Sequence, residues 1–462
     1  MPVIGYTRPG SYVQRVKNVS VSSDTVSTSV AGFVGEVKRG VAGKAITVTS
    51  WKEFTETFTL GYANPFQEGE LADAVFGFFN NGGTQAVIVR ALGKEAKKAK
   101  VTIGESLVIE AKEEGSFGND IDVEVEVKEE VAKLIVNVLG TQVETLSKIK
   151  VAEFASYVNA NSKFVNVVSG EAVKGNGTLI GGSNGELTVG DYKEALECLD
   201  VADVNVIAIP GVTTLGVQEA VVEYATKRGN VFPVLSAPAM ATVEEIKDFK
   251  DKMPGFCGAI YYPRILIADQ FTGEPKYVSP VGHMIGVYAR TDAERGVHKA
   301  PAGVEAYVAG AIGVEKVLTE TEVGILNDYE INCILPKKGY GIVAWGARLL
   351  NTDGDRQFVS DLRLDMYVEE TIKRNTEWAV FEPKDDQLFN RLQAQLTSEL
   401  TTMWRAGMLL GNSPEEAFYV KCDSELNPDI LSSTLEIEVG YAKKKPAEFI
   451  VTRVSHKQAS AE

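Results

Sequence analysis

The sequence predicts a multi-domain chain that combines α/β and α+β architecture. Its 462 residues exceed what one hydrophobic core usually organises, so roughly three domains are expected. From Gly181 onward, strand-like and helix-like segments alternate, which is typical of an α/β core with parallel strands. Between residues 94 and 178, apolar and charged residues alternate instead, which predicts antiparallel strands with one buried face.

These patterns divide the chain into six segments. They are an N-terminal arm (1–20), an N-terminal segment that packs with the middle domain (21–93), a β-rich insertion domain (94–178), an α/β middle domain (179–340), an α+β C-terminal domain (341–445) and a C-terminal arm (446–462).

Composition excludes several classes of protein. The net charge of -16 leaves the body without the clustered basic face that phosphate binding needs, which argues against a nucleic-acid surface. The sequence has no run of about 18 uncharged apolar residues, and so predicts no membrane span. The start of the chain has no signal-peptide pattern, so we expect a cytoplasmic protein. The four cysteines lie far apart without CxxC spacing and are expected to be reduced core residues.

The N-terminal segment is expected to contain two buried strands, 30–37 and 86–90, with a helix over 72–79 between them. A lysine-rich stretch at 94–100 marks its end. In the insertion, the alternation over 121–128 is repeated over 134–138 after a turn, which is typical of a hairpin.

The middle domain is expected to alternate helices and strands. The predicted helices are 191–199 and 215–227, and the predicted strands are 204–209, 231–235 and 258–268. The C-terminal domain is expected to open with a strand at 342–345 and to continue with two amphipathic helices. The second helix, 385–406, carries a stripe at four-residue spacing that favours core over a partner groove: Leu388, Leu392, Leu396, Leu400 and Trp404.

The termini contrast with the acidic body. Met1 to Ser23 contains three basic residues and no carboxylate, and Gly440 to Gln458 contains five basic residues against Glu448 alone. Cationic extended arms beside acidic strand edges favour pairing between chains, because an added strand gains main-chain hydrogen bonds and opposite charges fix its register. The alternative is two solvated tails.

The residues expected to form arm strands are Val3, Ile4, Tyr6, Arg8, Tyr12, Val13, Arg15, Val16, Phe449, Ile450, Val451 and Arg453. The expected acceptor strand is Leu435, Glu436, Ile437, Glu438 and Val439.

An α/β core also raises the alternative of a hydrolase-like enzyme, but the residues do not support it. Gly43-Lys44 lacks the upstream glycine and the following Ser or Thr of a phosphate loop. Gly181 to Gly185 lacks the GxGxxG order and is expected to be a turn. Of the three histidines, neither His283 nor His298 accompanies a nucleophile signature, and His456 lies in the C-terminal arm. No metal-ligand spacing is present, so we expect no catalytic residue, cofactor or metal.

Ordered motifs along nearly the whole chain resemble the contractile tail sheath proteins of bacteriophages and phage-tail-like bacteriocins. In the first half they are Ser29–Gly35, Thr49–Phe54, Phe78–Gly83, Gly115–Asn119 and Leu179–Gly185. In the second half they are Asp203–Gly211, Tyr261–Arg264, Gly296–Gly303, Leu326–Asn327, Trp345–Leu350, Trp378–Pro383, Phe418–Asp423 and Lys445–Ile450.

The resemblance implies a structural protein with a subtilisin-like α/β middle domain and no protease activity. It implies stacked hexameric rings around an inner tube, assembled in a bacterial cytoplasm, with baseplate and tail terminator proteins as further partners. The arms would join neighbouring subunits and bend near Asn18–Ser23 and Gly440–Lys445 during contraction. A helix of the C-terminal domain, either 361–373 with Lys373 or 385–405 with Arg391, would contact the tube. Whether the particle is a phage or a headless bacteriocin stays open.

Overall fold

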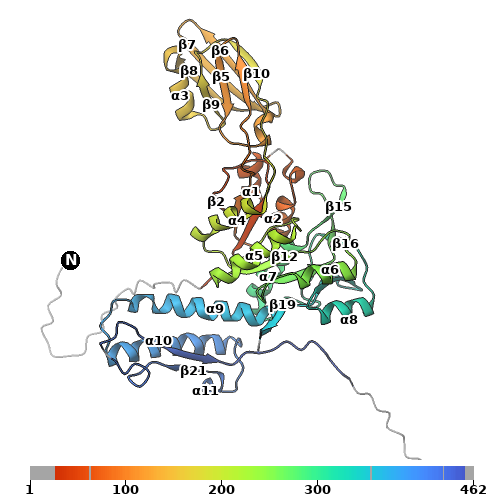
Figure 1. Ribbon diagram of the computed structural model, residues 1–462, viewed down its shortest axis with the longest axis vertical. Helices are drawn as coiled ribbons and strands as arrows, with labels where there is room; N and C mark the ends of the chain where they lie inside the picture. Colours follow the sequence, from red (N-terminus) through yellow and green to blue (C-terminus); the bar gives the residue numbers. More distant parts are fainter. Residues whose placement is uncertain (1–25, 62–63, 354–355, 430, 453–462) are drawn as a thin grey trace, which may run out of the picture.

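The computed structural model describes residues 26–61, 64–353, 356–429 and 431–452. Figure 1 shows an elongated molecule in three parts. A β-rich module projects at one end, a central sheet with its helices lies in the middle, and a layer built on two long helices lies at the other end. The described C-terminal stretch leaves from the part of the molecule opposite the projecting module (Figure 1).

The central sheet is mixed, with a parallel interior. Neighbours among its six inner strands run parallel, and each edge strand pairs antiparallel with its neighbour. Its strands, in spatial order, are β18 (Gly341–Trp345), β17 (Asn332–Lys337), β13 (Ala259–Tyr262), β12 (Phe232–Ser236), β11 (Val206–Ala208), β1 (Ala31–Gly35), β3 (Ala86–Arg90) and β2 (Ala45–Val48). The strands of the predicted N-terminal segment therefore lie in the same sheet as those of the middle domain.

Helices cover this sheet in interacting pairs. Helix α2 packs on α7, and α4 packs on α5. Close approach in the first pair depends on glycine, since a Cβ atom on Gly282 would lie 2.2 Å from the carbonyl oxygen of Ala74. The helices of this part are α1 (Trp51–Thr59), α2 (Leu71–Asn80), α4 (Val189–Glu197), α5 (Leu215–Arg228), α6 (Val243–Asp251), α7 (Val281–Arg295) and α8 (Glu320–Asp328).

Two sequence-based boundaries in this region are wrong. The strand predicted over 258–268 is interrupted at Pro263, which lacks the N–H needed to continue a ladder. Its second half, β14 (Ile265–Ala268), leaves the sheet and pairs with β15 (Pro275–Val278) and β16 (Ala311–Val314). The strand that was expected to open the C-terminal domain is β18, an edge of the central sheet, so a boundary at 340/341 cuts the β17–β18 hairpin.

The projecting module has its own hydrophobic core, which extends from Ala99 to Leu179. The predicted hairpin is present as β6 paired with β7 over eight residue pairs. One sheet has the order β10 (Gly175–Thr178), β6 (Ile121–Lys128), β7 (Val131–Val138), β8 (Thr141–Lys150), and the other has the order β4 (Lys100–Ile103), β5 (Leu107–Ala111), β9 (Val165–Ser169). Helix α3 (Phe154–Asn161) packs on β9. Strand β8 is an edge with two register irregularities and a left-handed residue, Lys148.

Arg90, at the end of β3, joins this module to the central sheet. Its side chain is 1% exposed and donates to the carbonyl oxygens of Val37 at 3.0 Å, Gly40 at 2.8 Å and Glu114 at 3.0 Å. It also donates to the side-chain oxygen of Asn184 at 3.3 Å. Each carbonyl belongs to a loop that would otherwise bury an unpaired acceptor, so one guanidinium holds both sides of the joint.

The two glycine-containing turns singled out in the sequence lie at this joint. Gly115 has φ of 116°, and a Cβ atom there would lie 2.3 Å from the Arg90 guanidinium. Asn119 and Gly182 exchange two hydrogen bonds of 2.8 Å, and Lys38 pairs with Asp120 at 2.9 Å. The turns therefore connect two cores, which explains their glycines without any ligand.

The remaining layer is built on helices α9 and α10, with α9 lying between the central part and α10 (Figure 1). The predicted leucine stripe on α10 is buried, which confirms the core interpretation: Leu392, Leu396 and Leu400 are each 1% exposed. The elements are β19 (Arg348–Asp353), β20 (Arg356–Phe358), α9 (Val359–Thr376), α10 (Asp386–Arg405), α11 (Pro414–Ala417), β21 (Phe418–Lys421) and β22 (Glu438–Tyr441). Short 3₁₀ turns occupy Pro65–Gln67, Ser116–Asp120, Val151–Glu153, Cys198–Val201 and Glu377–Ala379. Within the described residues, every helix is too short or too polar to span a bilayer.

The buried imidazole of His283 predicts acid sensitivity. Burial lowers its pKa to about 4, so the stability it contributes is complete above pH 6.5 and is lost as the pH falls through about 4. Between pH 7 and 4, the wild type should lose about 3 kcal/mol more unfolding free energy than His283→Asn. Denaturant titrations at the two pH values measure this. Asp73, whose pKa burial raises to about 6, titrates in both proteins and cancels in the difference. Equal losses in both proteins would contradict the prediction.

Replacing Arg90 should loosen the joint. Arg90→Gln leaves several buried carbonyl oxygens unpaired, so we expect a loss of about 3 kcal/mol and separate unfolding of the projecting module, which has its own core. Calorimetry detects the second transition, and trypsin should cut faster in the lysine-rich 94–100 segment. Arg295→Gln, which removes an exposed arginine, is the control. A single unshifted transition in Arg90→Gln would rule out this role.

Candidate functional site

The residues considered for catalysis do not come together among the described residues. His283 lies within the α2–α7 interface, and its Nδ1 atom has no hydrogen-bond partner. His298 is half-buried, and burial with the nearby charges of Lys444 and Arg295 lowers its pKa. Burial raises the pKa of the Cys257 and Cys333 thiols to about 12, which keeps them protonated. His456 lies outside the described residues.

The edge of the sheet where α/β proteins usually bind ligands is filled by side chains. Strand order reverses between β1 and β11, so the carboxyl ends of these strands mark the usual ligand crevice. Glu70 occupies it: the carboxylate pairs with Arg264 and accepts from the backbone N–H of Ser279 at 2.7 Å. A Cβ atom on Gly211 would lie 2.8 Å from the Glu70 side chain. No group of three or more potential metal-binding side chains occurs among the described residues.

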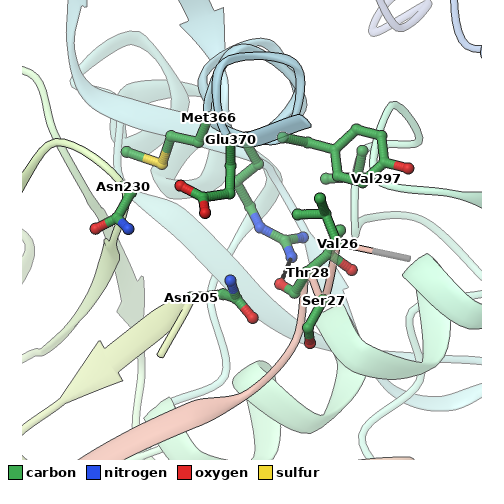
Figure 2. A pocket seen from close by; sticks show the side chains of 10 residues that line it. Val26, Ser27, Thr28, Asn205, Asn230, Val297, Met366 and Glu370 are labelled. Carbon is green, nitrogen blue, oxygen red and sulfur yellow. Dashed lines mark hydrogen bonds between the residues drawn. The ribbon is translucent and has the colours of Figure 1, made fainter. Parts of the chain in front are cut away.

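The first described residues before β1 are instead held in place by surrounding side chains. Figure 2 shows Val26, Ser27 and Thr28 lining a pocket together with Asn205 and with Met366 and Glu370 of α9. Asn205 accepts from the backbone N–H of Val30 at 3.0 Å. The segment that leads into β1 is therefore held by both the central sheet and α9.

Arg363 of α9 is the centre of this site. It forms two hydrogen bonds with Asp292 of α7, at 2.5 and 3.0 Å, and both side chains are nearly buried. The same guanidinium donates to the carbonyl oxygen of Thr28 at 2.8 Å and lies over the ring of Tyr288. One cation thus connects the α9 layer, the central part and the first described residues before β1.

Asp365, half a turn after Arg363 on α9, holds the start of the C-terminal segment at Tyr441 and Lys443. Its carboxylate, 3% exposed, accepts from Arg356 at 2.8 Å, from the Tyr441 hydroxyl at 2.5 Å and from Lys443 at 3.0 and 3.1 Å. Burial and the hydrogen bond to Asp365 raise the pKa of Tyr441. Lys444 donates to the carbonyl oxygen of Gly407 at 2.6 Å. The stretch 440–445, where a hinge was predicted, is tied to the body here by a strand and by charged side chains.

Beyond Lys444, the chain contacts the body again at Glu448. Arg348 donates to both carboxylate oxygens of Glu448, at 2.9 and 2.6 Å. The three predicted arm residues that follow are exposed: Phe449 by 74%, Ile450 by 87% and Val451 by 84%. They form no strand with the described part of the chain. The other arm residues, Val3 to Val16 and Arg453, lie outside the described residues, as does the hinge predicted at 18–23.

The acceptor strand was predicted a few residues too early. Strand β22 covers Glu438–Tyr441, so only Glu438 and Val439 of the predicted strand belong to it. Leu435 and Ile437 are packed instead against the buried cluster of α10. Strand β22 pairs antiparallel with β21, and within the described residues this sheet has two strands only. Both outer edges are thus without a further described strand.

The two tube-contact candidates differ in their surroundings. Lys373 is exposed near the end of α9, a helix whose first half is buried. Arg391 is exposed on α10, with its guanidinium 4.3 Å from the centre of the Trp378 ring. Eight further residues of α10 form an open, largely uncharged face: Asn390, Gln393, Ala394, Thr397, Ser398, Thr401, Thr402 and Arg405.

Sequence reasoning missed Arg363, Asp365 and Arg348. Asp361 and Asp365 lie four residues apart on a helix, a spacing that usually marks a solvated face, and Arg363 lies between them. Their burial follows from partners far along the chain. Arg348 lies within one of the sequence motifs quoted above, which was the only available signal.

Comparison with known proteins agrees with this architecture. Residues 185–349 match the family description "Phage tail sheath protein central domain". Over 206 residues, or 43% of this chain, the sequence is 23% identical to the tail sheath protein of Escherichia phage P2. The match spans about half, 51%, of that relative's length.

Solved structures share the fold over almost the full chain. A sheath complex of an extracellular contractile injection system, PVC, in the contracted state matches with a TM-score of 0.63 and 21% identity, covering 99% of both chains. The sheath tail protein of Desulfitobacterium hafniense matches with a TM-score of 0.66 and 14% identity, covering 89% of this chain and 93% of that one.

The corresponding protein of Listeria innocua matches with a TM-score of 0.65 and 13% identity, over 90% of this chain and 96% of its own. Through its matched central domain and this shared fold, the chain is similar to phage tail sheath proteins.

Proposed function

We propose that this chain is the structural subunit of a contractile tail sheath. Subunits would polymerise as stacked hexameric rings around an inner tube and contract to drive the tube through a target cell envelope. The family is structural and not enzymatic, which agrees with the filled crevice at the carboxyl edge of the sheet. Assembly would take place in a bacterial cytoplasm, with the inner tube, baseplate and tail terminator proteins as partners.

The observation that carries this proposal is the exposed apolar end of the C-terminal segment. Phe449, Ile450 and Val451 lie at the end of an acidic, otherwise well-packed body and have no cover in their own chain among the described residues. Exposed consecutive apolar residues on an extended segment are what strand addition to another chain requires. The sheet β21–β22 offers edges of the matching kind.

The arm pairing proposed from the sequence is refined by the acceptor geometry. We place the acceptor at Glu438–Tyr441 and its partner β21, and keep residues from Val3 to Val16 and from Phe449 to Arg453 as the inserted strands. Tyr419 donates to the Glu438 carboxylate at 2.7 Å on the surface of this sheet. A basic arm strand beside this acidic residue would be attracted to the sheet and fixed in register.

We also propose that the central part is the subtilisin-like α/β domain that the resemblance implies. Six parallel strands with paired helices support this. Such a body can rotate as a unit while the arms bend, so contraction requires no unfolding.

For the tube contact, we favour α10 over α9. Helix α9 lies between the central part and α10, and much of its surface is buried (Figure 1). Helix α10 keeps one polar face open along most of its length. A tube could approach this face without disturbing the core stripe on the other side.

Deletion of Met1 to Ser20 should abolish polymer formation. Without the arm, neighbouring subunits lose the strand that joins them, while the described body keeps its cores. Negative-stain electron microscopy should show hollow, ridged cylinders from the full-length chain alone. Circular dichroism and thermal unfolding of the truncated chain control for folding. Uniform small particles from both chains, each well folded, would refute the sheath function.

Charge reversal on each helix should show which of the two contacts the tube. Arg391→Glu should reduce co-sedimentation with the cognate inner tube by about tenfold, because an interfacial cation is replaced by a repelling or unpaired charge. Lys373→Glu, the matched control on α9, should co-sediment as the wild type does. The reverse pattern would place the contact on α9.

A further inference from the structure

The C-terminal segment stays attached to its own body for several residues beyond β22. The backbone of Lys443 forms an isolated β-bridge with Leu409, and its ammonium group binds the Asp365 carboxylate. The ammonium group of Lys444 donates to the carbonyl oxygen of Gly407. Among the described residues of this segment, the last ion pair is that of Glu448 with Arg348. These contacts attach the segment to the body at residues 443, 444 and 448.

This ion pair has a favourable geometry. Two donor atoms of Arg348 face the two oxygens of Glu448 in a bidentate arrangement, at 2.9 and 2.6 Å. The backbone of Arg348 is fixed in turn, since Asn332 accepts from its N–H at 2.6 Å and donates to its carbonyl oxygen at 2.8 Å. The side chain of Arg348 is only 13% exposed and that of Glu448 is 24% exposed. Solvent therefore screens this pair less than a surface ion pair.

Ionisation of the pair agrees with this geometry. Burial favours the neutral carboxyl, but hydrogen bonding and the charge of Arg348 outweigh it and hold the pKa of Glu448 below its usual value. The pair is therefore charged at neutral pH.

Lys444, Lys445, Ala447 and Glu448 are already exposed, and the exposed side chains become apolar after this pair. Glu448 is followed at once by three apolar residues that are 74–87% exposed. We propose that Arg348 and Glu448 form a latch that places the pivot of the C-terminal arm between Glu448 and Phe449. Residues before the pivot belong to the body, and only those from Phe449 onward swing toward a second copy of this chain. The latch deepens the proposed function, and its role in assembly rests on that function.

The position of the pivot has a physical consequence. A latch at Glu448 shortens the flexible tether and fixes the direction in which the apolar strand leaves the body. A shorter tether raises the effective concentration of the strand at a neighbour's sheet, because fewer arm conformations compete with binding. Release of the latch would lengthen the free segment back toward Lys444.

The rate of chymotrypsin cleavage after Phe449, in the unpolymerised full-length chain, tests the latch. Chymotrypsin cuts after exposed aromatic residues and needs an extended segment on both sides. Cleavage after Phe449 is followed by intact mass as the loss of residues 450–462. Glu448→Gln should accelerate it about fivefold, since it removes the charge of one partner. Cleavage after the fully exposed Phe381 is the internal reference. Glu305→Gln weakens an exposed pair in which one guanidinium nitrogen of Arg295 donates to both carboxylate oxygens, and it should leave both rates unchanged.

A charge swap separates the latch from any unrelated effect of substitution. Arg348→Glu and Glu448→Arg should each accelerate cleavage after Phe449, and the two together should restore the wild-type rate within about twofold. Wild-type rates in Glu448→Gln and in both single reversals would overturn the latch.

The same variants measure its role in assembly. Glu448→Gln should lower the pelleted polymer fraction several-fold at equal concentration, and the swap should restore it. Faster cleavage with unchanged polymer would overturn the proposed pivot. A wild-type chain that never polymerises would refute the sheath function, while the cleavage ratios still decide the latch.

Discussion

The buried ion pair of Arg363 and Asp292 is the interaction on which the arrangement of this molecule depends. It joins α9 to α7 across the boundary between two layers, and the same guanidinium holds the backbone at Thr28. Two charges removed from water are costly to bury, and such a pair is retained only when hydrogen bonds satisfy both groups. Here Arg363 has a carboxylate, a carbonyl oxygen and the ring of Tyr288 as partners. Loss of either charge would leave the other uncompensated, at a cost of about 3–5 kcal/mol.

Charged residues connect the parts elsewhere too, whereas apolar residues build each part. The projecting module and the central sheet have separate cores, and Arg90 bridges their loops. The α9–α10 layer has its own apolar clusters, and Asp365 gathers the chain that leaves it. Directional hydrogen bonds fix angles between units, while apolar contacts tolerate sliding. The body is therefore suited to move as one rigid unit, with flexibility confined to segments outside these joints.

Much of the fold could be predicted from the sequence, because hydrophobic periodicity reports burial directly. The segment 86–90 is a strand with the predicted limits, and the helix predicted at 215–227 is present as Leu215–Arg228. The stripe on α10 is core, as its spacing indicated. Errors arose where tertiary packing overrides local pattern. Leu435 and Ile437 alternate as in a strand, but they cover the α10 cluster, and pairing with β21 begins only at Glu438.

The candidate site was less predictable, because its charged partners are distant in sequence. Arg363 and Asp292 are separated by 71 residues, and Arg348 and Glu448 by 100. A single sequence gives no signal for such pairs, and each of these residues alone is compatible with a solvated surface.

The edge strand β8 has a consequence for crowding. In a polymer of this chain, the projecting modules would stand at very high local concentration, where an open edge could template sheets between neighbours. Strand β8 is a poor template, since its ladder is irregular twice and Lys148 turns the backbone left-handed between Lys150 and Leu146. In such a polymer, this edge would therefore add little strand pairing between neighbouring chains.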